Sequence, residues 1–404
     1  YVREQKADGA IPAFKGFHPA SLGTTYYAYI RTHNQNEIAE VKEKESFSAD
    51  RKLDYASTGT YYFAKGEIFK KYSQQLVEKK QLLQGEYYVS LVFNYLINDG
   101  FKVLVYEVEK FICWGTPHDL EQYNFWSNYF KDANEKLNEL QKYTFNVTNL
   151  IPLAGRGDDF LKEGYGLPKP LINVFDTPMC IRAVKSLPKA KKYILLFLQE
   201  HLDGYNISQL VKKVLPNSEI IPVGNLTEGM VSTCLLAKDK IDPNEALMIS
   251  SSNSEVQWNP EKFKELTEDD SVDVVIWTTR NHYSVRRNPK YHTYLKIKDG
   301  KIINISEKLP ISLTPEKDYA VAGNFYFKKS GDFIRAANSM IKKEIKINGQ
   351  YYVATAINEL IQEGKKVVPF EVDKIIYWGA SQDLREFQYW QSYFNKLGNP
   401  LYKK

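Results

Sequence analysis

The chain has 404 residues, 43% hydrophobic and 25% charged, so it can bury complete cores and is predicted to fold as two domains or three. Its 54 basic and 49 acidic residues give a net charge of +5, and this near-balance argues against a dedicated nucleic-acid binder. No apolar run approaches the roughly 20 residues of a membrane span. The three cysteines, Cys113, Cys180 and Cys234, fit no metal-binding spacing. We therefore expect a cytoplasmic protein that binds neither nucleic acid nor membrane.

The chain after residue 130 alternates between strand and helix patterns. Polar residues 131–142 predict a linking helix, and helices are also expected at 207–214, at 233–240 and from Thr177-Pro178, with Asp176 or Thr177 as the N-cap. Strands are expected at residues 145–154, 193–198, 219–223 and 246–250. The part from about residue 272 is richer in strands and ends in a helix at 382–397. This alternation predicts an α/β fold with crossover helices.

A repeat at an interval of 264 residues is the strongest signal in the sequence. Residues 87–130 and 351–394 align without a gap and are identical at 20 of 44 positions. The same interval relates Glu43-Lys44 to Glu307-Lys308 and Gly59 to Gly323. We therefore expect residues 1–142 to form the C-terminal half of a first domain, and residues 143–404 to form a complete second domain of the same kind.

The two copies differ in length, because the second has roughly 120 additional residues, from about Phe145 to Asp270. Either the sequence is a fragment whose first domain lacks its N-terminal half, or the natural protein has one and a half copies. A half-domain would expose strand edges and core to water, which favours the fragment.

A candidate phosphate cradle lies in the segment LAGRGDDFLKEGYGLPKPLI, residues 153–172. An expected strand runs into Gly155-Arg156-Gly157, and a Pro-Lys-Pro turn follows with Lys169 at its centre. Glycines let the backbone approach an anion closely, and the lysine supplies a mobile positive charge. Taken alone, a G-x-G after a strand is explained equally well as a tight turn.

Together with the PKPL segment, the sequence resembles the sugar-1-phosphate nucleotidyltransferases, whose signature is G-x-G-x-R-F followed by P-K-P-L. Thr227-Glu228-Gly229 resembles the T-E-G helix start of that family, and LMISSSNSEVQW at residues 247–258 resembles the strand that carries its metal-binding aspartate. Glu307-Lys308 and Gly323 resemble the sugar-phosphate half, and WGTPHDL at Trp114 resembles the closing motif. The resemblance covers essentially the whole chain.

This resemblance implies a Rossmann-like, GT-A-like mixed sheet flanked by helices, in tandem. It also implies transfer of a nucleotidyl group from a nucleoside triphosphate to a sugar 1-phosphate or similar phosphomonoester, with release of pyrophosphate and with Mg²⁺. The residues so implied are Lys169, Lys308 and Lys44 for catalysis, Gly155, Arg156, Gly157, Thr227, Glu228 and Gly229 for the nucleotide, and Glu307, Gly323, Glu43 and Gly59 for the sugar phosphate. For Lys169 and Lys308 a solvated surface lysine is the alternative.

Two departures from the family pattern predict that the second copy is degenerate. Asp159 stands at the arginine position, and each unit charge pair at about 6 Å contributes about 3 kcal/mol at a dielectric constant near 20. Asn253 stands at the Mg²⁺-binding aspartate and brings no negative charge, with Glu255 as the nearest possible replacement. The sequence thus predicts a nucleotidyltransferase with a competent first copy and a weak second one. The alternatives are a non-catalytic sugar-nucleotide-binding protein and a scaffold, and no oligomeric state is predicted.

Overall fold

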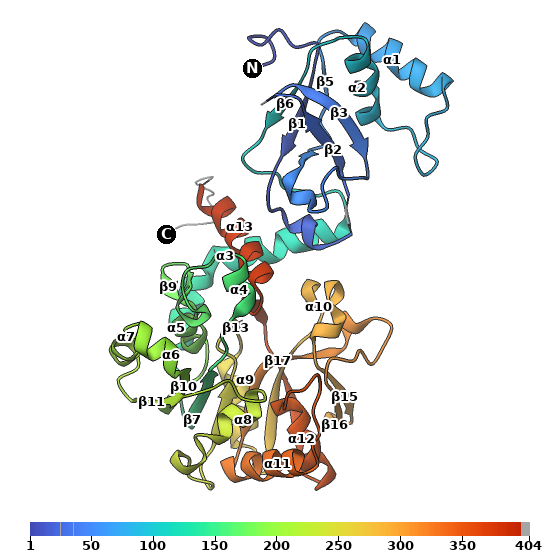
Figure 1. The fold of residues 1–404 in the computed structure, drawn as a ribbon. Helices are drawn as coiled ribbons and strands as arrows, with labels where there is room; N and C mark the ends of the chain where they lie inside the picture. Colours follow the sequence, from blue (N-terminus) through green and yellow to red (C-terminus); the bar gives the residue numbers. More distant parts are fainter. Residues whose placement is uncertain (25, 35, 397–404) are drawn as a thin grey trace. The chain divides into compact units, whose positions relative to one another are not determined.

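The computed structural model describes residues 1–24, 26–34 and 36–396 (Figure 1). The chain divides into two compact units: unit 1 comprises Tyr1–Ser127 and the chain from Arg385 onward, and unit 2 comprises Asn128–Leu384. Each unit has its own α/β core, and the domain boundary expected at residue 142 stays a prediction. In the part of the chain that the structure describes, no helix combines the length and the apolar character that crossing a bilayer would need.

Unit 1 is built on a six-stranded sheet of order β3-β2-β4-β1-β5, with β6 parallel to β1. Phe93, from a helix of this unit, is fully buried against strand residues such as Ile11 and Val105. The strands are β1 (Gly9–Phe14), β2 (Ala28–Thr32), β3 (Ile38–Glu43), β4 (Tyr55–Ser57), β5 (Tyr62–Phe63) and β6 (Val103–Glu107), and the helices are α1 (Gly66–Glu78) and α2 (Val89–Asn98). The boundaries between the units fall within α3 (Pro117–Leu140) and α13 (Ser381–Lys396).

Unit 2 is built on a nine-stranded mixed sheet of order β11-β10-β7-β12-β17-β14-β18, with β15 and β16 alongside β17. Its strands are β7 (Thr144–Leu153), β10 (Lys189–Leu198), β11 (Ser218–Val223), β12 (Leu247–Ser250), β14 (Val274–Thr279), β15 (Tyr294–Lys298), β16 (Lys301–Ser306), β17 (Tyr319–Phe327) and β18 (Val367–Glu371), and two short pairs are β8 (Asn173–Val174) with β9 (Thr177–Pro178) and β13 (Ser254–Gln257) with β19 (Lys374–Tyr377). Strands β7, β10, β11 and β12 run parallel, whereas β17 is antiparallel to both β12 and β14.

Helices cover both faces of this sheet because alternate strand residues are apolar on each side. Leu150, Ile194 and Ile249 pack in one buried cluster, and the next residues along, such as Ile151 and Leu195, pack in the other. Helices α8 (Met230–Leu235), α11 (Ser330–Lys342) and α12 (Val353–Gln362) contribute to the first cluster, and α5 (Met179–Lys185), α7 (Ile207–Val214) and α9 (Pro260–Glu268) to the second. The remaining helices are α4 (Asp158–Lys162), α6 (Gln199–Gly204) and α10 (Tyr283–Arg287). The expected mixed α/β fold is confirmed.

Several expected helix bounds were wrong. Helix α5 begins at Met179, because Thr177 and Pro178 form β9 instead. The helix expected at 233–240 is α8 followed by a separate 3-10 turn at Lys238–Lys240, since α8 starts directly after Gly229. The linking helix expected at 131–142 is the end of α3, which has a non-helical residue at Asp132. Helix α13 starts at Ser381, and Leu397, its expected last residue, lies outside the described residues.

Unit 1 and the second half of unit 2 have elements at corresponding positions. Helices α1 and α11 begin 264 residues apart, as do α2 and α12, and strands β6 and β18. Near the start of the unit the interval is 265: the Asp8 and Gly9 amides donate to the Lys102 carbonyl, as the Asp273 and Val274 amides donate to that of Lys366. The repeat in the sequence therefore has a counterpart in the element bounds.

Candidate functional site

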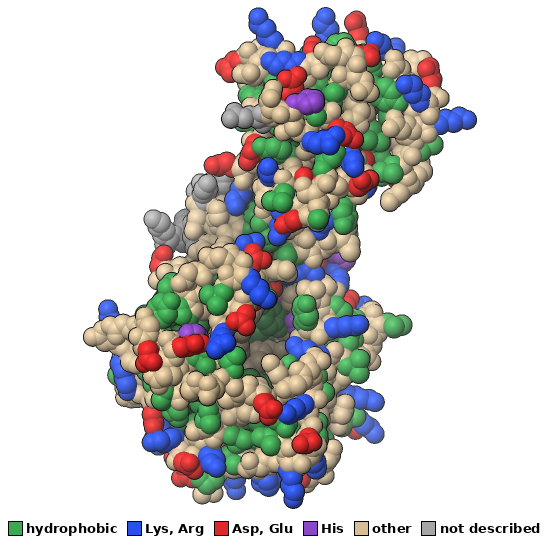
Figure 2. All heavy atoms as spheres, in the orientation of Figure 1, with side chains coloured by type: hydrophobic (Ala, Val, Ile, Leu, Met, Phe, Trp, Pro, Cys, Tyr) green, Lys and Arg blue, Asp and Glu red, His purple; other side chains and the backbone are tan. Residues whose placement is uncertain are grey.

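Two cavities lie in unit 2 at the carboxyl ends of the parallel strands β7 and β12, where open α/β sheets usually bind ligands. The smaller has a volume of about 150 Å³ and is lined by Gly155, Lys169 and Ser252, among others. The larger has a volume of about 420 Å³. Asn253 lines both cavities. Figure 2 shows the surface of unit 2 hollowed on one face, with hydrophobic side chains at the floor.

The glycine loop brings Lys169 to the smaller cavity. Gly157, at the end of the loop after β7, has φ +71°, and a Cβ there would lie 2.8 Å from the Cβ of Lys169. A glycine is therefore needed at this position, and it lets the loop and the Lys169 segment pack closely. The Lys169 ammonium donates a hydrogen bond to the Gly379 carbonyl. Burial lowers the pKa of Lys169, although the carboxylates of Asp159 and Asp383 oppose that shift.

The turn at residues 379–383 is held by the glycine-loop side of the site. The Ser381 amide donates to Oδ2 of Asp159 at 2.8 Å. Asp383 lies in the same turn, where burial raises its pKa while Lys169 and Arg287 lower it. Arg156 points elsewhere, because it pairs with Glu200 at 3.1 Å on the surface. Asp159, Lys169 and Asp383 therefore form a small charge cluster in which the lysine is surrounded by carboxylates and a carbonyl.

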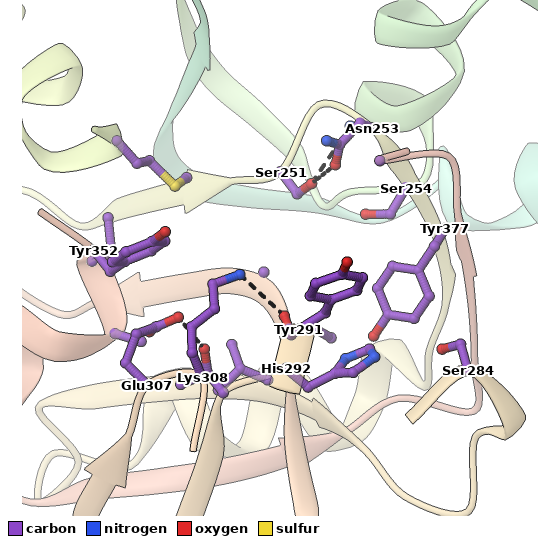
Figure 3. A pocket seen from close by; sticks show the side chains of 18 of the residues that line it. Ser251, Asn253, Ser254, Ser284, Tyr291, His292, Glu307, Lys308, Tyr352 and Tyr377 are labelled. Atoms are coloured by element: carbon purple, nitrogen blue, oxygen red, sulfur yellow. Dashed lines mark hydrogen bonds between the residues drawn. The ribbon is translucent and has the colours of Figure 1, made fainter. Parts of the chain in front are cut away.

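The larger cavity contains the residues expected to bind the sugar phosphate. Glu307, Lys308 and Gly323 line it together with Asn253 (Figure 3). The Glu307 carboxylate accepts a hydrogen bond from Thr293 Oγ1 at 2.7 Å through Oε1, whereas its Oε2 is buried without a partner among the described residues. Burial raises the pKa of Glu307. An unsatisfied buried carboxylate oxygen is costly, so this atom is positioned to accept a hydrogen bond from a ligand.

Lys308 reaches into the larger cavity from a strained backbone position. Its φ of +58° is in the left-handed region, and its Nζ donates to the Tyr291 carbonyl at 3.2 Å. Lys44 repeats both features in unit 1, with φ +59° and a 3.2 Å hydrogen bond to the Tyr26 carbonyl. Such strain at a non-glycine residue is most often found at functional sites.

Aromatic side chains that the sequence did not point to line the same cavity. Tyr291, Tyr352 and Tyr377 face it from three different segments, and His292 lies beside Tyr377, with ring centroids 5.7 Å apart (Figure 3). The Tyr377 hydroxyl has no hydrogen-bond partner among the described residues, and burial raises its pKa. Burial lowers the pKa of His292 to about 4, so its ring is neutral near pH 7. Isolated tyrosines carry no motif, and only the fold brings them together.

The surroundings of Asn253 do not fit a magnesium ion. Mg²⁺ prefers carboxylate and water oxygens in octahedral geometry. Asn253 offers a neutral amide whose Oδ1 already accepts a hydrogen bond from Ser251 Oγ at 2.5 Å. Among the described residues, no group of three or more His, Cys, Asp or Glu side chains is placed to hold a metal ion. The nearby carboxylates of Asp159 and Asp383 are instead engaged with backbone amides of residues 380–381.

Glu255 is not a replacement metal ligand, and that expectation was wrong. It is 1% exposed and forms an ion pair with Arg182, whose Nε lies 2.5 Å from Oε2. The Tyr129 hydroxyl donates to the same oxygen at 3.0 Å. Along β13 the side chain of Glu255 points away from the cavity because neighbouring strand residues alternate sides. Its carboxylate therefore belongs to a buried structural network.

The other expected site residues lie outside the two cavities. Thr227 Oγ1 is 2.6 Å from Thr233 Oγ1 at the start of α8, and Glu228 pairs with Lys346 at 2.7 Å on the surface. Gly229 packs against the backbone of Tyr351. In unit 1, Glu43 accepts a hydrogen bond from Ser90 Oγ at 2.5 Å, and the Gly59 amide donates to Ser57 Oγ at 3.0 Å. The structure thus brings together Gly155, Lys169 and Asn253 in one cavity, and Asn253, Glu307, Lys308 and Gly323 in the other.

Comparison with known proteins identifies the fold but not a sequence family. No family model matches the chain, and no curated protein matches it. A nucleoside-diphosphate-sugar pyrophosphorylase from Vibrio cholerae is similar in structure, with a TM-score of 0.50 and 18% identity over 59% of this chain and 98% of that one. An inositol-1-phosphate CTP transferase from T. maritima (TM-score 0.47, 12% identity, 62% and 96% covered) and a UDP-glucose pyrophosphorylase complexed with UDP-glucose (TM-score 0.48, 15% identity, 62% and 100% covered) also match. The similarity to the first of these shows the fold of a sugar-phosphate nucleotidyltransferase.

Proposed function

We propose that unit 2 is a nucleotidyltransferase-like domain that binds a phosphorylated sugar or a nucleotide sugar in the two cavities without itself transferring a nucleotidyl group. The fold and the position of the cavities at the strand ends support a nucleotide-sugar ligand. The charges at the site argue against the transfer reaction.

One observation carries this proposal: the charge of Lys169 is already used inside the protein. In nucleotidyl transfer an anionic phosphate attacks a triphosphate, so the site must present preorganised cations to the developing charge. Here the Lys169 ammonium is bound to the Gly379 carbonyl and faces Asp159 and Asp383. Of the described residues that line the larger cavity, Lys308 is the one lysine or arginine. A single lysine suits one phosphate group better than a triphosphate.

The larger cavity offers groups that suit the sugar part of such a ligand. Lys308 can pair with a phosphate, and Glu307 Oε2 can accept hydrogen bonds from sugar hydroxyls. The Tyr377 hydroxyl can donate or accept at the inner end. The tyrosine rings provide apolar surface for the sugar carbons, as is usual in small-molecule sites.

We extend the proposal to the arrangement of the chain. Residues 1–142 then represent the second half of one nucleotidyltransferase-like domain, and residues 143–404 represent a complete diverged one. The corresponding element bounds and the shared geometry of Lys44 and Lys308 support this relationship. Any Mg²⁺-dependent transfer activity would then belong to a complete first copy rather than to unit 2.

Calorimetry and an activity assay on the intact chain test the binding proposal. A hexose 1-phosphate, a uridine diphosphate sugar and uridine triphosphate are titrated in Mg²⁺ and again in EDTA, and pyrophosphate release is measured in parallel. We expect a phosphorylated sugar to bind equally well in both buffers, with no pyrophosphate released. Binding of none of these ligands, or Mg²⁺-dependent pyrophosphate release, would contradict the proposal.

A further inference from the structure

Unit 1 exposes large hydrophobic side chains whose counterparts in unit 2 are buried. Tyr62, Phe69, Tyr87, Val89 and Tyr106 are 36–45% exposed. Their counterparts at the interval of 264 residues, Tyr326, Phe333, Tyr351, Val353 and Phe370, are each 1–7% exposed. We call the five unit 1 side chains the edge surface. Single exposed hydrophobic residues are common, but a set that is buried throughout in a related unit marks a contact surface.

The segment that covers these positions in unit 2 is known residue by residue. Strand β12 pairs with β17 so that Met248 lies opposite Tyr326, and the Phe263 ring of α9 is 5.8 Å from that of Tyr326 and 5.3 Å from that of Phe370. The Tyr351 amide donates to the Glu228 carbonyl at 2.8 Å, and the Tyr351 carbonyl accepts from the Val231 amide at 3.2 Å. One stretch of chain, residues 228–263, thus supplies an edge strand, a helix start and an aromatic cap.

Unit 1 ends at a strand edge where unit 2 continues. Strand β5 is the last strand of the unit 1 sheet and pairs with β1. Tyr62 and Phe63 of β5 correspond to Tyr326 and Phe327 of β17, which pair on their other side with β12. An open strand edge flanked by apolar side chains is a template for an added strand.

We propose that the edge surface is the docking face for an α/β half-domain of the kind formed by residues 144–263, which adds a strand antiparallel to β5 and is joined to unit 1 through Tyr1. The connection follows from the interval of 265 at the start of the unit: Tyr1 corresponds to Leu266 of α9, the helix that leads from the covering segment of unit 2 into β14. This inference rests on the duplication proposed above, but it holds whatever ligand the cavities of unit 2 bind.

A fusion tests the proposal directly. A second copy of residues 143–265 is placed ahead of Tyr1 in the full chain, so that it enters unit 1 in the register of unit 2. Hydrogen exchange is then compared with that of the unfused chain. The amides of residues 61–63 and 87–89 should exchange at least tenfold more slowly in the fusion. Phe69→Asp should abolish this protection, whereas Leu53→Asp should not, because Leu53 is an exposed residue of unit 1 whose counterpart, Lys317, is polar. Unchanged exchange at residues 61–63 overturns the proposal.

A second measurement uses the chain without any fusion. Phe69→Asp should leave the unfolding midpoint of unit 1 within about 1 °C of the parent value, because the side chain is 39% exposed. Phe333→Asp should lower the midpoint of unit 2 by several degrees, because the matched residue is 1% exposed. If Phe69→Asp is as destabilising as Phe333→Asp, the edge surface is already covered and the proposal fails. Ligand binding by unit 2 is measured separately, so failure here leaves that proposal standing.

Discussion

At the scale of single residues, Lys308 has the clearest role in ligand binding. It is held in a left-handed backbone conformation and is the cationic residue among the described lining of the larger cavity. We predict that Lys308→Ala weakens the binding of a sugar phosphate by about tenfold to a hundredfold, since hydrogen bonds to charged groups contribute about 1.5–3 kcal/mol. Calorimetry measures the change. The matched control is Lys44→Ala in unit 1, which removes the same type of contact and should leave the affinity unchanged; equal losses in both variants would refute the assignment.

The buried histidine His282 predicts a pH dependence of stability. Its Nε2 lies 3.1 Å from the Ile375 carbonyl, and burial lowers its pKa from 6.5 to about 3. The folded protein therefore keeps this ring neutral while the unfolded chain takes up a proton, so stability falls as the pH drops from about 6.5 towards 3. The slope from one such group is about 1.4 kcal/mol per pH unit.

Urea unfolding of unit 2 at pH 7, 6 and 5 measures this slope. His282→Gln should be less stable than the parent at pH 7 but should lose less stability on acidification. His33→Gln, on the exposed surface of unit 1, is the control and should not alter the slope. An unchanged slope in His282→Gln would show that other groups cause the acid sensitivity.

At the same scale, the sequence predicted which residue types lie near the site better than it predicted where they point. Lys169, Asn253, Glu307 and Lys308 were singled out from short motifs, and the fold places all four at the cavities. Glu255 was misread because sequence distance from Asn253 does not reveal that its side chain faces Arg182. Tyr377 carries no motif, since its place at the cavity depends on the pairing of β13 with β19.

At the scale of elements, the glycine loop between β7 and α4 tests how the site is assembled. Gly157→Ala would place a Cβ 2.8 Å from Lys169 in a left-handed conformation, and we expect it to cost about 1–3 kcal/mol of unfolding free energy and to weaken ligand binding. Gly155→Ala is the matched control, because its Cβ would meet no atom within 4 Å. Denaturant unfolding and calorimetry check both variants. Equal effects of the two substitutions would mean that the close packing on Lys169 does not position the site.

Strands were easier to predict than helix ends for a physical reason. Residues 193–198 are a continuous apolar run and are buried throughout, as expected for a parallel strand with helices on both faces. Helix α5 begins later than predicted because Thr177 and Pro178 pair with Asn173 and Val174 in a short hairpin. A proline close to a helix start is compatible with either arrangement, so tertiary pairing decides the boundary.

At the scale of the whole molecule, the distribution of charge matters more than its sum. The net charge of +5 says nothing about the site, where Asp159 and Asp383 face Lys169 and where Asn253 supplies no charge. Length and the repeat predicted more than one structural unit and a mixed α/β fold. They did not predict that α3 and α13 contain the boundaries between the units, because a helix pattern does not show which core each turn packs against.

The central claim is that unit 2 lacks the cations and metal ligands that a triphosphate requires, and one calorimetric comparison tests it most directly. Asn253→Asp with Asp159→Arg restores the charges of the family pattern, whereas Asn253→Asp with Asp158→Arg changes the net charge equally but places the arginine one residue away. We predict that the first variant binds uridine triphosphate in Mg²⁺ at least tenfold more tightly than the parent chain and the control. An affinity that is unchanged, or raised equally in both variants, would contradict the account.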